Sequence, residues 1–346
     1  MIKSKKTKKL KFPSELRSGP LSKDWVLIAT GRSKRPETFK KEKRKEVIPS
    51  KKTCPFCHIE KQEEPTLVFV NGKKVKIKNK IPKDWTLAVI PNKYPAFIPS
   101  DTLNERSEGL YKKMNGAGYH EIVVTRDHKK QIAKFSKLKA KEVIDAYQER
   151  YLDLMNENFV NYVSIFHNQG PEAGASIFHP HSQIIAAPVI DPDLYRAILS
   201  SKNYFKAHKK CIYCLMNNWD RERKERIIFE NKDFLVICPF ASKTAFEMII
   251  SPKKHLSYFE RINEEEKNYL AEALQVSLNK LYKALNNPPY NFYLHTAPCD
   301  GKNYNFYHWH WTILPKTATW AGFELCTGIE ISTIEPEKAA EYLRKQ

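Results

Sequence analysis

The strongest constraint on the fold of this 346-residue chain is an internal repeat, in which one series of motifs occurs twice in the same order. Each copy opens with a C-x-x-C pair and an apolar stretch with turn residues. A β-rich run, a histidine, a helical pattern, a second strand-like run and an H-x-H motif then follow. The copies run from Cys54 to His181 and from Cys211 to His310. From the lone histidine to the H-x-H motif, the separation is 51 residues in the first copy and 53 in the second. Chance does not readily supply this whole order twice, so we infer two homologous halves.

The repeat predicts an α+β fold. In both halves short β-rich runs surround one long amphipathic helical pattern, around residues 143–155 and 270–285. We therefore expect two tandem halves, residues 20–190 and 191–346, each an antiparallel sheet with a long helix. Residues 1–19 are expected to form a basic N-terminal arm. Two copies fit a fused pair better than a solenoid, which needs at least three repeats.

The C-x-x-C pairs predict two metal sites. Two thiolates at this spacing can share one tetrahedral Zn²⁺, which then needs two further ligands. The predicted sets are Cys54, Cys57, His128 and His179 in the first half, and Cys211, Cys214, His255 and His308 in the second. A redox role for the pairs is an alternative. His120 is the rival to His128, which we favour because it has a counterpart in the second half. Four ligands leave no open position, so both zinc ions are expected to be structural.

The second histidine of the first H-x-H motif is the candidate nucleophile. Residues i and i+2 of an extended segment point the same way, so His181 lies beside His179 and Gln183 continues that face. A neutral imidazole attacks phosphorus readily near pH 7, and an amide can donate to a phosphoryl oxygen without adding charge. The preceding turn, from Asn168 through Gly174 to Ser176, offers backbone and hydroxyl donors for phosphate oxygens. The second half has Thr312 in place of the glutamine, and we expect it to be catalytically degenerate.

The charge of the chain admits a different class of function. The formal net charge is +20, and residues 1–50 hold 16 Lys/Arg against 5 Asp/Glu. A zinc-stabilised nucleic-acid-binding protein would carry such charge. The His-Pro-His-Ser-Gln segment favours an enzyme instead, because a binding module needs no such constellation, and we expect no nucleic acid partner. No apolar run suits a membrane span or a secretory signal, so we expect a cytoplasmic protein.

These motifs resemble those of the galactose-1-phosphate uridylyltransferase family, within the histidine triad superfamily. The resemblance covers nearly the whole chain. The segment from His179 to Gln183 is similar to the family signature, and residues 168–183 match without a gap. Further similar segments are residues 17–29, 32–36, 54–57, 92–96 and 322–328.

The resemblance implies a ping-pong reaction in galactose metabolism. His181 would attack the α-phosphorus of UDP-glucose, release glucose 1-phosphate and pass UMP to galactose 1-phosphate. The positions carried over are Asn168, Ser176 and Gln183 for phosphate or nucleotide, Asn92 for the nucleoside, Arg32 and Arg35 near the phosphates, and Glu324 near the hexose. The partners are thus a nucleotide sugar and a hexose 1-phosphate. Family members are homodimers with sites shared between subunits.

A related enzyme keeps the choice of substrate open. ADP-glucose phosphorylase has the same architecture, with a Cys-Cys-His-His set in its second half, whereas some uridylyltransferases lack that cysteine pair. Cys211 and Cys214 therefore leave both the base and the hexose undecided. In this alternative, phosphate attacks adenylyl-His181 and releases ADP.

Overall fold

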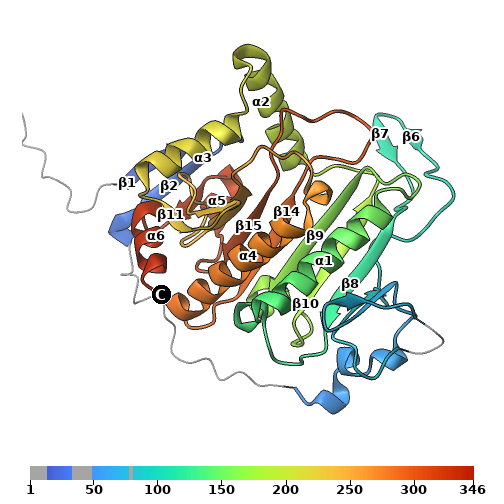
Figure 1. Ribbon diagram of the computed structural model, residues 1–346. Coiled ribbons are helices and arrows are strands. Elements are labelled where there is room, and N and C mark those ends of the chain that lie inside the picture. The colour runs from blue at the N-terminus through green and yellow to red at the C-terminus, as the bar shows by residue number, and fades with distance from the viewer. Residues whose placement is uncertain (1–13, 33–48, 78–80) are drawn as a thin grey trace, which may run out of the picture.

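The computed structural model describes residues 14–32, 49–77 and 81–346, and its centre is one antiparallel sheet (Figure 1). Eleven strands form this sheet within the described residues. In spatial order they are β11 (Ile227–Glu230), β12 (Phe234–Ile237), β13 (Met248–Pro252), β15 (His310–Pro315), β14 (Tyr290–His295), β9 (Tyr162–Gln169), β10 (His181–Ala187), β8 (Tyr119–Thr125), β5 (Leu87–Pro91), β3 (Leu67–Val70) and β4 (Lys73–Lys74).

Each half supplies the antiparallel strands and the long helix that the repeat predicted, but the two sheets are continuous. The first half contributes β9-β10-β8-β5-β3-β4 and the second β14-β15-β13-β12-β11. Read outward from the centre, the first five strands of each half follow the same order, and β4 is an additional edge strand. The halves meet where β9 pairs with β14, with Gln169 opposite Tyr290 and Phe166 opposite Tyr293. Residues on the shared strands can therefore reach across from one half to the other.

Two long helices cover one face of the sheet, α1 (Lys137–Leu154) and α4 (Glu264–Leu285), and they lie side by side (Figure 1). The Ser136 hydroxyl caps α1 by accepting from the backbone N–H of Lys139, and Asn263 forms a capping box with Glu266 at the start of α4. Asn286 ends α4 in the left-handed conformation. The apolar positions of both patterns are buried against the strands, which leaves the opposite sheet face for other contacts.

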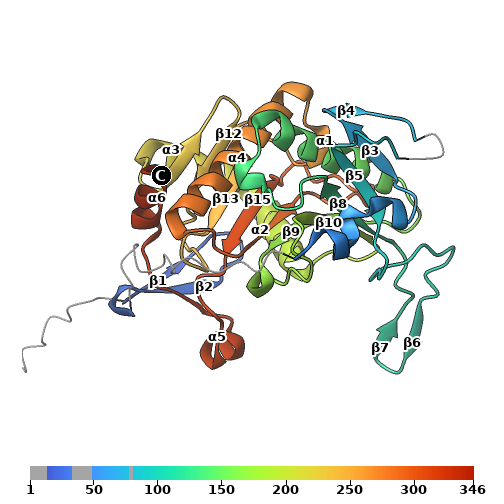
Figure 2. The same ribbon diagram turned by 90° about the horizontal axis from the view of Figure 1, so that it is seen from below.

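The chain's first described strands attach to its last ones. Strands β1 (Ser14–Ser18), which lies within the segment assigned to the arm, and β2 (Trp25–Ala29) form a small sheet with β16 (Glu330–Ser332). Arg17 donates to Glu337 of α6 (Pro336–Arg344) at 2.9 Å. Figure 2 shows this β1–β2 hairpin beneath the second half. The turn of this hairpin lines one cavity together with helices α2 (Pro192–His208) and α3 (Ile212–Arg223).

Two segments project from the body on the side away from α1 and α4 (Figure 2). One is the hairpin of β6 (Arg106–Glu108) and β7 (Tyr111–Lys113), and the other contains the short helix α5 (Gly322–Thr327). None of the described helices is both long and apolar enough to cross a membrane.

Candidate active site

The structure gathers the predicted ligands of the first half into one group. One ligand atom from each of Cys54, Cys57, His128 and His179 lies within 4.8 Å of the others. The Nδ1 atoms of both histidines face the thiols, and Cys57 Sγ is 3.2 Å from His128 Nδ1. The opposite Nε2 atoms donate to backbone carbonyls, of Pro49 for His128 and of Thr125 for His179. Such a carbonyl partner orients an imidazole that binds a metal, so this donor set fits a tetrahedral ion.

The second half repeats this group with its own four residues, Cys211, Cys214, His255 and His308. His308 Nε2 donates to the carbonyl of Pro252 at the end of β13, as His179 does to Thr125 at the end of β8. Both groups can therefore hold a metal ion. His120, the rival ligand, belongs to neither group.

His181 is the first residue of β10, directly beside the first metal group, and only 8% of its surface is exposed. Its Nδ1 lies 2.9 Å from the carbonyl oxygen of His179, so Nδ1 carries a proton and donates it there. Nε2 then has a free lone pair. Burial lowers the pKa of the ring, which keeps it neutral near pH 7. Phe56, from the C-x-x-C turn, packs against His181 with ring centroids 5.0 Å apart. The metal group thus helps to fix the imidazole.

Gln183 follows on the same face of β10, and a neighbouring histidine fixes its amide. The backbone N–H of Ala96 donates to His120 Nδ1 at 3.1 Å, so the proton of this ring is on Nε2. Nε2 lies 2.8 Å from Gln183 Oε1 and donates to it. Because Oε1 is used in this way, the NH₂ group of Gln183 is the part left to donate to a ligand. Asn92 lies against the same imidazole, with its Nδ2 3.4 Å from Nδ1 and 3.1 Å from Nε2.

The predicted phosphate-binding turn joins the end of β9 to this site. Gly170 and Gly174 have φ of +84° and +88°, which favours glycine at both positions. The backbone N–H groups of residues 173–175 donate to carbonyls within the turn itself, so the expectation that they face a ligand is wrong for these three. The turn lines a cavity of about 490 Å³, which Asn168 and the exposed Ser176 also line.

Asn168 is held from the second half of the chain. Asn291 of β14 donates through Nδ2 to Asn168 Oδ1 at 2.7 Å and to the carbonyl of Ala173 at 2.8 Å. Because the Asn168 oxygen is thus occupied, its own NH₂ group is the part left for a ligand. The sheet register places Asn168 opposite His181, since the next residues, His167 and Ser182, pair.

The remaining predicted residues lie apart from this cluster or outside the described chain. Arg35 is outside the described residues, and Arg32 ends a 3₁₀ turn, Thr30–Arg32, whose last side chain is not described. Glu324 lies in α5, where its carboxylate accepts from the backbone N–H of Ala321. Neither cavity beside the sheet has Glu324 in its lining.

The sequence reasoning did not find His120 and Asn291 as parts of the site. The sequence presents His120 only as a possible metal ligand. Its contact with Gln183 depends on the register of β8 against β10, which no local pattern reveals. Asn291 belongs to the half expected to be degenerate. Only the pairing of β9 with β14 brings it to the first half.

Comparison with known proteins agrees with this geometry. Residues 4–191 match the family model of the galactose-1-phosphate uridyl transferase N-terminal domain, and residues 198–345 match that of the C-terminal domain. The chain is 32% identical to ADP-glucose phosphorylase of Arabidopsis thaliana over 96% of its own length and 92% of the relative. It is 29% identical to galactose-1-phosphate uridylyltransferase of Thermotoga maritima over 96% and 98%.

A solved structure of the Arabidopsis thaliana ADP-glucose phosphorylase with bound ADP-glucose is also similar. It superposes with a TM-score of 0.78 at 30% identity, covering 96% of this chain and 99% of that one. The relatives are nucleotidyltransferases, and so is this enzyme. The chain belongs to the galactose-1-phosphate uridylyltransferase family.

Proposed function

We propose that this enzyme is a hexose-1-phosphate uridylyltransferase that transfers UMP from UDP-glucose to galactose 1-phosphate through a covalent uridylyl-His181 intermediate. The observation that carries the proposal is the orientation of His181. Its Nδ1 proton is used by the His179 carbonyl, which leaves a neutral Nε2 as the attacking atom. Asn168 and Gln183 each present an NH₂ group on the same sheet face.

In the first half-reaction, the lone pair of His181 Nε2 attacks the α-phosphorus of UDP-glucose. The bond from this phosphorus to the bridging oxygen breaks, and glucose 1-phosphate leaves with that oxygen and its electron pair. The imidazole is then substituted at Nε2 and positively charged. The hydrogen bond from Nδ1 to the His179 carbonyl stabilises this charge. The amides of Asn168 and Gln183 donate to phosphoryl oxygens, which gain charge during attack.

The second half-reaction reverses these bonds with a different acceptor. A phosphate oxygen of galactose 1-phosphate attacks the uridylyl phosphorus, the P–N bond breaks, and its electron pair returns to Nε2. UDP-galactose leaves, and His181 is neutral again. No group needs to change its protonation, because His181 Nδ1 keeps its proton throughout and the attacking phosphate oxygen is already ionised.

We also propose that each four-residue group binds one structural zinc ion. Two thiols and two imidazoles are the donor set typical of closed zinc sites. In the first half, bound zinc would hold the Cys54–Cys57 turn, and with it Phe56, against His181. The second site would brace a half that has lost its catalytic residues.

We propose a homodimer in which the projecting segments meet the partner. Leu110 before β7, Tyr111 at its start, and Phe323 and Leu325 in α5 are largely apolar and exposed. Clustered exposed apolar side chains are typical of protein interfaces. This arrangement would let Glu324 of one subunit approach the hexose side of the partner's site.

ADP-glucose phosphorylase is the second candidate function. It is favoured by the similarity to the Arabidopsis thaliana enzyme and by the complete Cys-Cys-His-His group in the second half. Phosphate would then attack adenylyl-His181, and the products would be ADP and glucose 1-phosphate.

The mass of the intact protein tests both candidates. The enzyme is mixed with UDP-glucose or with ADP-glucose, in each case without an acceptor. We expect a gain of one UMP from UDP-glucose that is absent in His181→Asn. A gain from ADP-glucose alone would assign the adenylyl function instead. No adduct from either donor would refute the covalent mechanism.

A further inference from the structure

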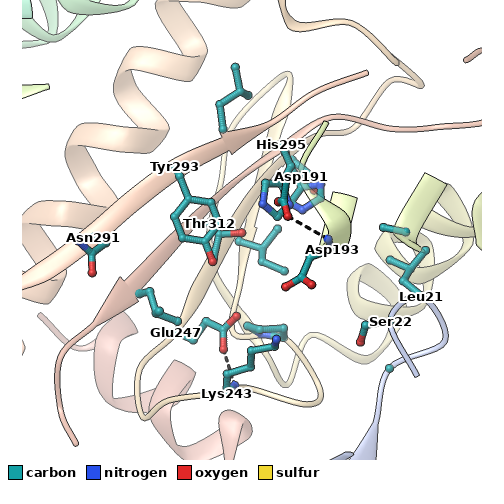
Figure 3. Close-up of a pocket in the computed structure, with 18 of the residues that line it drawn as sticks. Leu21, Ser22, Asp191, Asp193, Lys243, Glu247, Asn291, Tyr293, His295 and Thr312 are labelled. Atoms are coloured by element: carbon teal, nitrogen blue, oxygen red, sulfur yellow. Dashed lines mark hydrogen bonds between the residues drawn. The ribbon is translucent and has the colours of Figure 1, made fainter. Parts of the chain in front are cut away.

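A second and larger cavity lies on the same open sheet face as His181, over the second half. Its volume is about 800 Å³, which is within the range of ligand pockets. The floor consists of residues from β9, β10 and β12 to β15, and it reaches the first site at Asn168 and Asn291. The walls come from α2, α3 and the turn of the β1–β2 hairpin. Figure 3 shows Tyr293, His295 and Thr312 on the floor, with Leu21 and Ser22 opposite.

This cavity occupies the position that the active site has in the first half. His310 corresponds to His181 as the second histidine of its H-x-H motif, and Thr312 corresponds to Gln183. His295 pairs with His310, as Asn168 stands opposite His181. All three second-half residues line the cavity.

The counterpart of the predicted nucleoside contact lines it as well. Leu87 pairs with Thr125, whose carbonyl accepts from His179, and Phe234 pairs with Pro252, whose carbonyl accepts from His308. Leu87 and Phe234 are therefore equivalent positions in the two halves. Five residues further on, Asn92 therefore corresponds to Pro239, which also lines this cavity. The repeat has thus kept a cavity where the first half holds the residues expected to bind a nucleotide.

The charge of the cavity excludes the phosphate part of such a ligand. Four carboxylates line it, those of Asp24, Asp191, Asp193 and Glu247. Within the described lining, Lys243 is the only Lys or Arg, and its ammonium lies 3.7 Å from Asp24. Glu247 accepts from the backbone N–H of Lys243 (Figure 3). Burial favours the protonated form of Glu247, but the three aspartates still outnumber the one lysine, so a phosphate would meet net negative charge here.

The remaining lining suits a flat ring with hydroxyl groups. Aromatic side chains surround the cavity, namely Phe97, Tyr162, Phe166, Tyr213, Phe240 and Tyr293. Such rings stack on a base. His295 contacts the rings of Tyr293 and His310, both with centroids 5.1 Å away, but has no hydrogen-bond partner among the described residues. Its imidazole, together with the carboxylates, can hydrogen-bond to sugar hydroxyls.

We propose that this cavity is a second binding site, specific for an uncharged nucleoside rather than a nucleotide. The inference rests on the proposed nucleotide binding by the first half, but it does not require covalent catalysis there. Uridine and adenosine are the probes, because the first site is expected to take one of these two nucleosides as its nucleotide.

The test is equilibrium binding of radiolabelled uridine and adenosine to the full-length His181→Asn protein, with its first site saturated by UDP-glucose or ADP-glucose. We expect one nucleoside to bind, and its 5′-monophosphate to bind at least about tenfold more weakly because of the carboxylates. Ala197→Trp, which places a large ring in the cavity from α2, should reduce nucleoside binding at least about tenfold. Ala207→Trp is the matched control, since Ala207 is exposed on the same helix outside the lining, and it should change nothing.

Adduct formation on the wild-type background separates this proposal from the proposed function. Ala197→Trp should form the nucleotidyl adduct at the unaltered rate. The second-site proposal is overturned if neither nucleoside binds the saturated protein, if the monophosphate binds as well as the nucleoside, or if Ala197→Trp binds like Ala207→Trp. Failure of adduct formation in wild type would count against the covalent mechanism alone.

Discussion

Replacing Asn291 by alanine should slow nucleotidyl transfer although the residue belongs to the other half of the chain. The change removes two hydrogen bonds, of 2.7 Å to Asn168 and 2.8 Å to Ala173. At about 1 kcal/mol each, these bonds contribute roughly 2 kcal/mol to holding the Asn168 amide in its orientation, and this contribution is lost. Since 1.4 kcal/mol is a factor of ten, the rate of adduct formation should fall about 30-fold.

Asn291→Asp sharpens the test, because it keeps the shape and removes the donor. A carboxylate would face two acceptor oxygens, and the Asn168 amide would have to turn its NH₂ group away from the ligand. We expect adduct formation to be slower than in Asn291→Ala. Rapid-quench measurement of the adduct, with melting temperature recorded in parallel, distinguishes orientation from unfolding.

Asn161→Ala is the matched control. Asn161 also donates from a partly buried amide to a loop carbonyl, that of Pro188, at 2.8 Å, but it lies at the other end of β9. Its loss should cost about 1 kcal/mol of stability and leave the adduct rate unchanged. A rate within about threefold of wild type for both Asn291 variants would refute the idea that this residue positions Asn168.

Three further predictions follow from the site. His181→Asn should abolish adduct formation at full metal content, whereas Cys54→Ser should lose one metal equivalent and lower the melting temperature; metal loss in His181→Asn would mean that the two histidine roles are exchanged. His120→Phe removes the hydrogen bond that orients the Gln183 amide, so it should lower kcat/KM about fivefold in wild type but not in a Gln183→Leu background. Additive losses in this double-mutant cycle would contradict the proposed orientation of the amide. Burial raises the pKa of Glu247 from 4.5 to about 7, so the folded state binds this proton more tightly than the unfolded state. The free energy of unfolding should therefore fall by up to about 3 kcal/mol as pH rises from 4.5 to 7. Urea unfolding of Glu247→Gln should lack this loss, and an equal dependence of the unfolding free energy on pH in both proteins would exclude Glu247 as its source.

Much of the architecture could be predicted because the two copies of the repeat can be compared position by position. A motif that recurs at nearly the same spacing indicates residues with the same structural role, and this recurrence favours His128 over His120 beside the cysteines. Alternation along an extended segment was enough to place Gln183 beside His181. Both inferences use short-range geometry, which the sequence carries directly.

The contacts that depend on long-range pairing could not be predicted. Nothing near Asn291 indicates that β14 will pair with β9 rather than remain in a separate sheet. The same limit applies to the small sheet, where β2 pairs with β16 about 300 residues later in the chain. The prediction that backbone N–H groups of the turn after Asn168 bind phosphate was wrong for a different reason. Its composition suits phosphate binding, but three of its amides satisfy carbonyls of the turn itself.

The joint between β9 and β14 has a consequence for dividing the molecule. Because these strands run antiparallel at the centre of an order that reads the same outward in both directions, two identical halves could form the same joint. A chain severed between residues 190 and 191 would bare β9 in one fragment and β14 in the other, and an unprotected edge strand attracts another strand. Coexpressed fragments should therefore recombine into one complex. An isolated first fragment should pair with its own copy or aggregate, and a stable, monomeric first fragment would show that the edge is protected in some other way.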